Sequence, residues 1–217
     1  MAPNPRMQPT GPEGRGAPLG RRFRERVCAG AGLRAHRQVV RRTNHRVLMR
    51  CAICGEEHDW STMEPSFERP DAYWAVPEVE RPHRTLAGKS DCRIRDSADT
   101  QRRFFLRVML PIPIRGEGRQ CNWGIWVEVS AADFKRTWDR WEDADQASEP
   151  AFSGVLANSI GGYPETVGLP GRVQLTGPST TPDFTFDDDV EHPFAQEQRD
   201  GVFPERRLEW LMQRAHE

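Results

Sequence analysis

Residues 104–114 have the sequence Phe104-Phe105-Leu106-Arg107-Val108-Met109-Leu110-Pro111-Ile112-Pro113-Ile114, the strongest strand pattern in this 217-residue chain. Its aromatic and β-branched side chains favour a pleated, half-buried strand. The two prolines near its end suit an edge strand or the end of a strand, because proline has no N–H to donate to a neighbour. We therefore predict a long strand that defines the centre of the fold.

The segment that follows predicts the partner of this strand. Arg115-Gly116-Glu117-Gly118 has the composition of a turn, and residues 121–129 form a second apolar run. In a strand, alternate side chains share a face. Trp123, Ile125, Val127 and Val129 would lie on one face, with Trp126 and Glu128 on the other. Together the two runs predict an antiparallel hairpin.

Helical patterns follow the hairpin. Ser130 is placed to cap a helix near 131–142, in which Phe134, Trp138 and Trp141 form an apolar stripe of the kind that usually faces a core. Further helices are predicted near 193–199 and 204–215, and short strands at 172–176 and 184–186. The fold class is therefore α+β. We expect a single domain over 47–217, an antiparallel sheet centred on 103–129 with flanking helices.

The N-terminal 50 residues differ sharply in charge from the rest of the chain. They contain 12 arginines, no lysine and two acids, a net charge of +10, whereas residues 51–217 carry −11. Residues 1–46 are rich in Arg, Pro and Gly, and we predict a disordered basic tail. Such a tail is either an arm for nucleic acid or dispensable, with translation starting near Met49. The missing aromatic platform favours the second interpretation.

Composition also limits the compartment. The chain has no apolar stretch long enough for a transmembrane helix and no apolar core of a signal peptide near its start. Its five cysteines, an odd number, suggest reduced thiols. We therefore predict a cytoplasmic protein without a membrane partner, and the sequence leaves the oligomeric state open.

Cys51-Ala52-Ile53-Cys54-Gly55 places two thiols on one tight turn, which is half of a tetrahedral zinc site. The remaining ligands would come from His58 and from either Cys92 or His192. A structural zinc site formed by Cys51, Cys54, His58 and Cys92 is the hypothesis that we carry forward. The alternative is a pair of reduced thiols on a hairpin turn. Disulfide exchange is disfavoured, because Glu56 and Glu57 would raise the pKa of the thiols.

A second candidate for chemistry lies near His192. A histidine beside carboxylates can act as a tuned base, and several acids lie close to it in sequence: Asp187, Asp188, Asp189, Glu191 and Glu197. The alternative is that His192 caps or packs at the start of a helix while the acids lie on a solvated loop. The chain contains none of the short motifs of serine hydrolases, P-loop proteins or zinc proteases.

Seven short blocks along the chain carry a family resemblance. They are Cys51-x-x-Cys54-Gly55-x-x-His58, Asp91-Cys92, Phe104-Phe105-Leu106-Arg107, Pro111-Ile112-Pro113, Trp123-Gly124-Ile125-Trp126-Val127, Tyr163-Pro164-Glu165-Thr166 and the segment from Glu191 to Gly201. In this order they resemble domain-of-unknown-function family 2199, a bacterial family without an assigned activity. The resemblance covers about 50–210 and implies a domain boundary but no reaction. Two departures are Glu191, where the family commonly has Asp, and the direct adjacency of Asp91 and Cys92.

These observations favour a non-enzymatic binding or regulatory protein, with a structural zinc knuckle. The acidic body and its many aromatic residues suit a surface that recognises a protein partner. The same body would repel nucleic acid, which only the tail would attract. The alternative is a small enzyme that uses the His192 region. An enzyme should have a concave pocket that brings together His192, Asp91 or Arg107.

Overall fold

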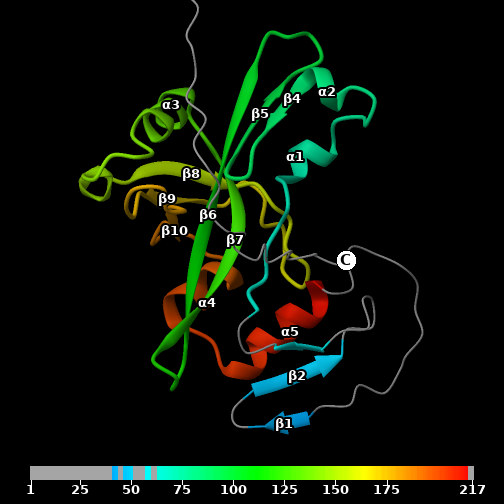
Figure 1. Ribbon diagram of the computed structural model, residues 1–217, viewed down its shortest axis with the longest axis vertical. Helices are drawn as coiled ribbons and strands as arrows, with labels where there is room; N and C mark the ends of the chain where they lie inside the picture. Colours follow the sequence, from blue (N-terminus) through cyan, green and yellow to red (C-terminus); the bar gives the residue numbers. More distant parts are fainter. Residues whose placement is uncertain (1–40, 44–45, 51–56, 60–62, 215–217) are drawn as a thin grey trace, which may run out of the picture.

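The computed structural model describes residues 41–43, 46–50, 57–59 and 63–214 (Figure 1). Three short strands precede the main body: β1 (Arg41–Thr43), β2 (Arg46–Arg50) and β3 (Glu57–Asp59), paired antiparallel in that order. Within the predicted tail, only residues 41–43 and 46 belong to the described part, and the remainder lies outside it. Disorder of residues 1–46 and a domain start at 47 therefore stay predictions.

The predicted hairpin is confirmed. β6 (Arg102–Ile114) and β7 (Arg119–Val129) pair antiparallel from Phe104 opposite Val129 to Ile114 opposite Arg119. Gly116 and Gly118 have positive φ angles of 78° and 62° in the connecting turn, which glycine adopts without steric cost. The two long strands rise through the whole body in Figure 1.

Strands β6 to β10 close into a barrel. Strand β7 pairs with β8, β8 with β9 and β9 with β10, all antiparallel. The ring closes where Asp183 of β10 pairs in parallel with Met109 of β6. The remaining strands of the ring are β8 (Phe152–Leu156), β9 (Pro170–Gln174) and β10 (Asp183–Phe186). The five-stranded barrel is mixed, with one parallel and four antiparallel pairings.

The predicted antiparallel sheet with flanking helices is therefore wrong, although helices and strands are both present. The closure depends on how β6 uses its second edge. Residues 102–106 of that edge pair with β5 (Asp91–Arg95), and Met109 pairs with β10. β5 continues the sheet into β4 (Thr85–Ala87). Local side-chain patterns identify a strand but do not specify a partner that lies far along the chain.

Helices cover one face of the long hairpin. The ring of Trp123 lies 5.6 Å from that of Phe194 and 5.4 Å from that of Trp210, between ring centroids, so α4 (Pro193–Asp200) and α5 (Pro204–Arg214) pack against β7. α3 (Ala131–Asp139) covers the other end, where Phe134 contacts Phe104. The three helices lie where the sequence predicted them. No helix in the described ranges is long and apolar enough to cross a bilayer.

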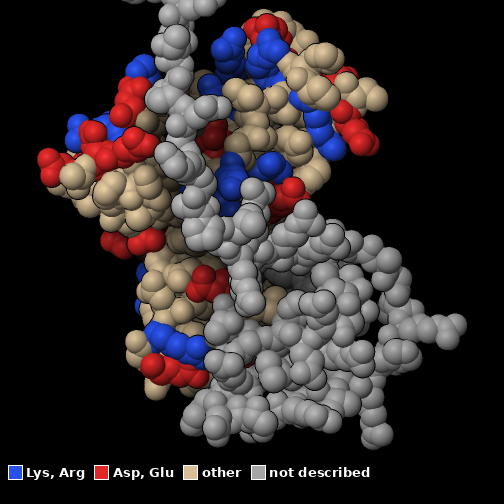
Figure 2. All heavy atoms as spheres, viewed as in Figure 1, with Lys and Arg blue, Asp and Glu red and all other residues tan. Residues whose placement is uncertain are grey.

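The irregular segment 63–84 begins along the edge of β7 that does not pair with β6, where the Phe67 N–H donates to the Gly124 carbonyl at 2.8 Å. It contains α1 (Asp71–Trp74) and α2 (Arg81–Arg84). The indole of Trp126 donates to the Phe67 carbonyl at 3.2 Å, and the Trp126 backbone N–H donates to Asn158 Oδ1 at 2.8 Å. The segment is therefore an irregular connection with two short helices, held to the body by hydrogen bonds. Figure 2 shows acidic side chains gathered over α3 and the segment after it.

Candidate functional site

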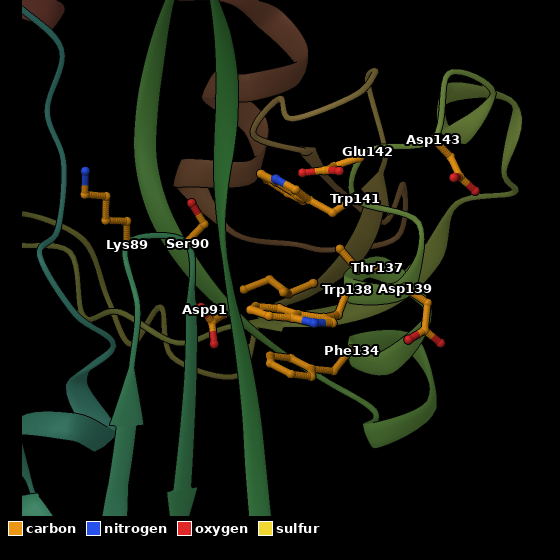
Figure 3. Close-up of a pocket in the computed structure, with 11 residues that line it drawn as sticks. Lys89, Ser90, Asp91, Phe134, Thr137, Trp138, Asp139, Trp141, Glu142 and Asp143 are labelled. Carbon is orange, nitrogen blue, oxygen red and sulfur yellow. The ribbon is translucent and has the colours of Figure 1, made fainter. Parts of the chain in front are cut away.

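A cavity of about 590 Å³ lies between α3 and the turn that joins β4 to β5 (Figure 3). Aromatic and acidic side chains form most of its wall. The lining residues are Lys89, Ser90, Asp91, Leu106, Phe134, Thr137, Trp138, Asp139, Trp141, Glu142 and Asp143. Asp91 and Leu106 come from the sheet, and the aromatic residues come from α3 and the segment just after it.

The aromatic wall depends on where α3 begins and ends. The Ser130 hydroxyl accepts a hydrogen bond from the Asp133 N–H at 3.0 Å, which confirms the predicted cap. The helix ends at Asp139. Phe134 is buried as predicted, but Trp138 is 60% exposed and Trp141 lies beyond the helix. The predicted core stripe is therefore wrong for Trp138, which instead contributes to the cavity wall.

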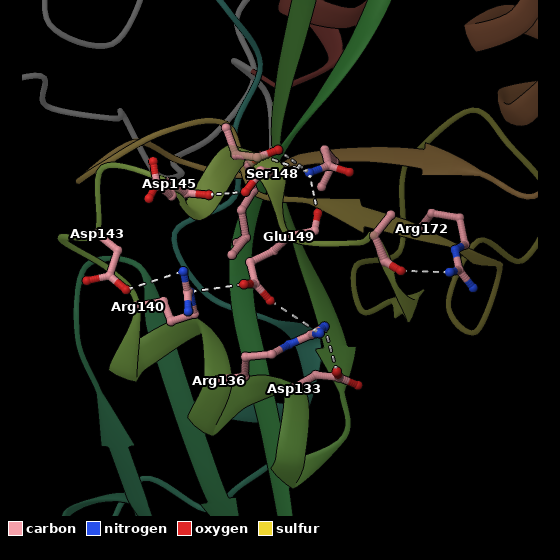
Figure 4. Close-up of polar contacts among 12 residues, drawn as sticks. Asp133, Arg136, Arg140, Asp143, Asp145, Ser148, Glu149 and Arg172 are labelled. Atoms are coloured by element: carbon pink, nitrogen blue, oxygen red, sulfur yellow. Dashed lines mark hydrogen bonds and ion pairs between the residues drawn. The ribbon is translucent and has the colours of Figure 1, made fainter.

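Ion pairs hold the segment after α3 against the helix (Figure 4). The Glu149 carboxylate lies 3.8 Å from Arg136 Nη1 and 3.2 Å from Arg140 Nε. The same two arginines pair with Asp133 at 3.1 Å and Asp143 at 3.5 Å. A buried glutamine, Gln146, donates to the Trp141 carbonyl at 2.8 Å. These contacts fix Trp141 at the edge of the cavity.

The opposite wall is the turn between β4 and β5. The Gly88 N–H donates to the Asp91 carbonyl at 2.8 Å, and the Arg107 N–H of β6 donates to the Ser90 carbonyl at 2.9 Å. A Cβ on residue 88 would clash with Asp91 Oδ1, so glycine allows the Asp91 carboxylate to pack against the turn. Asp91 consequently faces the edge of Trp138 across the cavity (Figure 3).

The cavity carries more negative than positive charge. Four acids and one lysine line it. Asp139 pairs with Lys135, and Asp143 pairs with Arg140. Glu142 has no ion pair within the described part of the chain, and Asp91 lies 3.7 Å from Arg93 Nη2. The Thr137 hydroxyl is buried and has no hydrogen-bond partner among the described residues. The cavity thus offers a polar atom and two poorly neutralised carboxylates to a ligand.

Arg93 shows which group the aromatic wall accepts. Its guanidinium carbon lies 5.5 Å from the ring centroid of Phe134 and 5.8 Å from that of Trp138. Cations are attracted to aromatic faces at such distances. A guanidinium therefore already lies on one side of this wall, beside the Asp91 carboxylate.

The structure tests the predicted zinc ligands only in part. Cys51 and Cys54 lie outside the described residues, and His58 lies in β3 opposite Met49. Cys92 is fully buried in β5, where burial raises the pKa of its thiol to about 11. At neutral pH that thiol is protonated and behaves as a small apolar side chain. The described residues contain no cluster of three potential metal ligands. Zinc binding stays a prediction.

His192 lies at the start of α4, where its Nδ1 accepts a hydrogen bond from the Phe194 N–H at 3.1 Å. The interpretation as a helix cap is confirmed. Nε2 is buried and has no hydrogen-bond partner among the described residues. Of the acids near it in sequence, Asp188, Asp189 and Glu191 are exposed.

Glu197 belongs to a separate polar network. Its carboxylate accepts from the Tyr163 hydroxyl and from Arg206 Nε at 2.9 Å, and the Trp210 indole donates to that hydroxyl at 2.7 Å. Burial, with the neighbouring carboxylate, raises the pKa of Tyr163 above its ordinary value. The cavity contains Asp91 but neither His192 nor Arg107 among its lining residues. An enzyme built on His192 therefore stays a prediction.

Sequence reasoning missed several residues of the cavity: Lys89, Ser90, Thr137, Asp139, Glu142 and Asp143. The nearest sequence pattern was the tryptophan pair Trp138 and Trp141 followed directly by two acids. The two tryptophans were interpreted as part of an apolar stripe that faces a core. Only the approach of the β4–β5 turn converts it into one wall of a cavity.

The fold and the cavity define the molecule as a small mixed β-barrel protein with an acidic, aromatic-walled pocket at one end. The family model described as an uncharacterized protein conserved in bacteria (DUF2199) matches residues 50–202, and the chain belongs to this family. This match confirms the resemblance drawn from the sequence blocks. No curated protein and no solved structure matches the chain.

Proposed function

We propose that this bacterial protein is a binding protein whose pocket receives a positively charged side chain of a protein partner. The observation that carries the proposal is the pairing of Glu142 and Asp91, two poorly neutralised carboxylates, with the indole wall formed by Trp138 and Trp141. A carboxylate and an aromatic face are the two groups that recognise a guanidinium or an ammonium.

Two physical terms favour a cation over a neutral ligand. A cation on an exposed indole face gains about 0.5–1 kcal/mol, and more where water is excluded. A hydrogen bond to a charged group contributes about 1.5–3 kcal/mol. The Thr137 hydroxyl, buried without a partner in the described residues, supplies a further acceptor for an N–H of the ligand.

The size and charge of the molecule favour a protein partner. A volume of about 590 Å³ is that of a pocket for one side chain or small group, not that of an extended groove. The net charge of −11 over residues 51–217 opposes binding of nucleic acid to this face. The same charge speeds association with a basic partner.

The proposal retains two parts of the sequence interpretation. A cytoplasmic location is supported by the odd number of cysteines, which suits reduced thiols. A structural zinc ion at Cys51 and Cys54 is supported by the spacing of the motif. Its role would be structural, to hold the turn that the motif predicts.

Calorimetric titration of the full chain with an acetylated, amidated tetra-arginine peptide tests the proposal. The variant Asp91→Asn/Glu142→Gln should bind the peptide about thirtyfold more weakly, since each of the two lost contacts between partly exposed charges contributes on the order of 1 kcal/mol. Asp188→Asn/Asp189→Asn is the matched control. It removes the same charge from two exposed acids outside the cavity and should bind within about twofold of wild type.

Trp138→Ala tests the aromatic wall separately. Because Trp138 is 60% exposed, its removal should leave the fold intact while weakening peptide binding about threefold to tenfold. Thermal unfolding of each variant checks the fold. Equal affinities for the pocket and control variants, or no measurable binding to wild type, would refute the proposed recognition site.

A further inference from the structure

The guanidinium of Arg107 has no hydrogen bond and no ion pair with any described residue. The side chain is half-buried, and its Nε atom is buried without a partner. An arginine keeps its charge at every physiological pH, so it cannot avoid the cost of burial by losing a proton. Burying part of a charge without a counter-ion costs free energy of folding, so an arginine in such a place suggests a function.

The structure makes room for this side chain. Arg107 and Gly124 lie on neighbouring strands of the hairpin, and a Cβ on residue 124 would lie 3.1 Å from Arg107 Nη2. The guanidinium therefore lies against the bare backbone of β7. Both residues belong to blocks that carry the family resemblance, 104–107 and 123–127. Because Gly124 has no side chain, the Arg107 guanidinium can pack against the backbone of β7.

A second guanidinium, that of Arg69, lies against the side chain of Trp126. The guanidinium carbon of Arg69 is 6.0 Å from the ring centroid of Trp126, and Trp126 is the direct cross-strand neighbour of Arg107. Only Nη1 of Arg69 is occupied, by the carbonyls of Glu68 and Gly88 at 3.0 Å. Figure 2 shows basic side chains recessed in the middle of the view, between α1 and the β6–β7 hairpin.

The acids near this pair are already engaged. The Asp71 carboxylate accepts from Asn158 Nδ2 at 3.1 Å and from the Ser159 N–H at 2.7 Å. Neither arginine has a carboxylate within 4 Å among the described residues. Two guanidinium groups without a carboxylate counter-ion among the described residues favour binding of an anion from solution.

We propose that Arg107 and Arg69 bind an oxyanion, which is a carboxylate or a phosphate group. This site lies on the face of the hairpin opposite the acidic, aromatic-walled pocket. The planar guanidinium of Arg107 offers parallel N–H donors to two oxygens of such a group. This site is independent of the proposed recognition of a cation.

Thermal unfolding of the full chain in inorganic phosphate, in acetate and in chloride of equal ionic strength tests the site. Wild type should unfold at a higher temperature in phosphate or acetate than in chloride, because a ligand of the folded state stabilises it. Arg107→Met should lose this rise, with an apparent affinity at least tenfold lower. Arg102→Met, on an exposed residue of the same strand, is the matched control and should keep it.

The arms of the experiment identify the anion. A rise in phosphate alone indicates a phosphate ligand, and a rise in acetate alone indicates a carboxylate. In chloride, Arg107→Met should be at least as stable as wild type, because it removes an unpaired charge, whereas a structural role would make it less stable. Arg69→Met provides a second variant if Arg107→Met fails to fold. The proposal is overturned if the unfolding temperature rises equally in wild type, Arg107→Met and Arg69→Met. It is also overturned if the unfolding temperature of wild type does not rise in either anion.

The two proposals fail separately. Asp91→Asn/Glu142→Gln should keep the response to phosphate or acetate, and Arg107→Met should keep the affinity for the tetra-arginine peptide. If only the rise in unfolding temperature with phosphate or acetate is absent, the inference about Arg107 is refuted. The proposed recognition of a cation by the acidic pocket then still stands.

Discussion

Gly124 lies in the middle of β7, with Ser66 and the Arg107 guanidinium packed against it. A Cβ at this position would be 2.8 Å from Ser66 Cβ and 3.1 Å from Arg107 Nη2. Gly88 has a similar role in the β4–β5 turn, where it makes room for the Asp91 carboxylate. In both places a missing side chain determines where a charged neighbour lies, so a glycine positions a residue of each proposed site.

We predict that Gly124→Ala lowers the free energy of unfolding by about 1–3 kcal/mol, the usual cost of overpacking a closely packed site. Urea unfolding measures the change. Ser66→Gly in the Gly124→Ala background should recover part of the loss, because it removes the nearer of the two clashing atoms. Full additivity of the two substitutions would show that the contact is not the cause.

At the scale of elements, strand β10 depends on helix α4 for part of its hydrogen bonding. β10 pairs with β6 only at Asp183. Beyond that pair, Gln198 Oε1 accepts from the Phe186 N–H at 2.9 Å and Gln198 Nε2 donates to the Phe184 carbonyl at 2.8 Å. The glutamine therefore takes the place of a neighbouring strand along the rest of β10. Closure of the barrel rests on a side chain as well as on strand pairing.

Replacing Gln198 should destabilise the protein strongly. Gln198→Ala leaves two buried backbone groups without a partner, each costing about 1–3 kcal/mol, so we expect a total loss of roughly 2–6 kcal/mol in urea unfolding. Gln196→Ala is the control on the same helix. Gln196 is exposed and contacts Asp200 at 3.4 Å, so its loss should change stability by no more than about 0.5 kcal/mol. Equal effects would contradict the proposed closure.

At the scale of the whole molecule, one apolar core joins the barrel, the helices and the irregular segment. Two thiols, those of Cys92 and Cys121, lie within it, and burial raises the pKa of each from 9.0 to about 11. The pKa of Tyr163 is raised as well. In all three cases the folded state holds its proton more tightly than the unfolded state does. Stability from this source is complete below pH 9 and is lost as the pH rises.

We predict that the free energy of unfolding falls between pH 9 and pH 11, by roughly 2–3 kcal/mol for each buried thiol. Urea unfolding at pH 8 and pH 10.5 measures the decrease. Cys92→Ala/Cys121→Ala should be less stable than wild type at pH 8, because it leaves cavities, but should lose less stability on going to pH 10.5. Tyr163 is present in both proteins and cancels in the comparison. Equal losses would refute the role of the thiols.

Short-range patterns predicted much of the fold. The hairpin, the Ser130 cap and the three helices follow from alternation, capping and composition within a few residues. The family was also evident from the sequence blocks, and the family match confirms it. These features depend on residues that are close together in the chain, and such local relations can be read directly from the sequence.

The closed barrel and both proposed sites were decided only by tertiary structure. Closure joins Asp183 to Met109, and the cavity forms where the β4–β5 turn meets α3. Trp138 was predicted to be core because its helical spacing is that of a buried stripe, yet it lines the mouth of the cavity. The sequence alone determined the hairpin, the strands near 172–176 and 184–186, and three helices. Their partners were set by long-range packing, because burial and strand pairing are satisfied between residues that are distant in the chain.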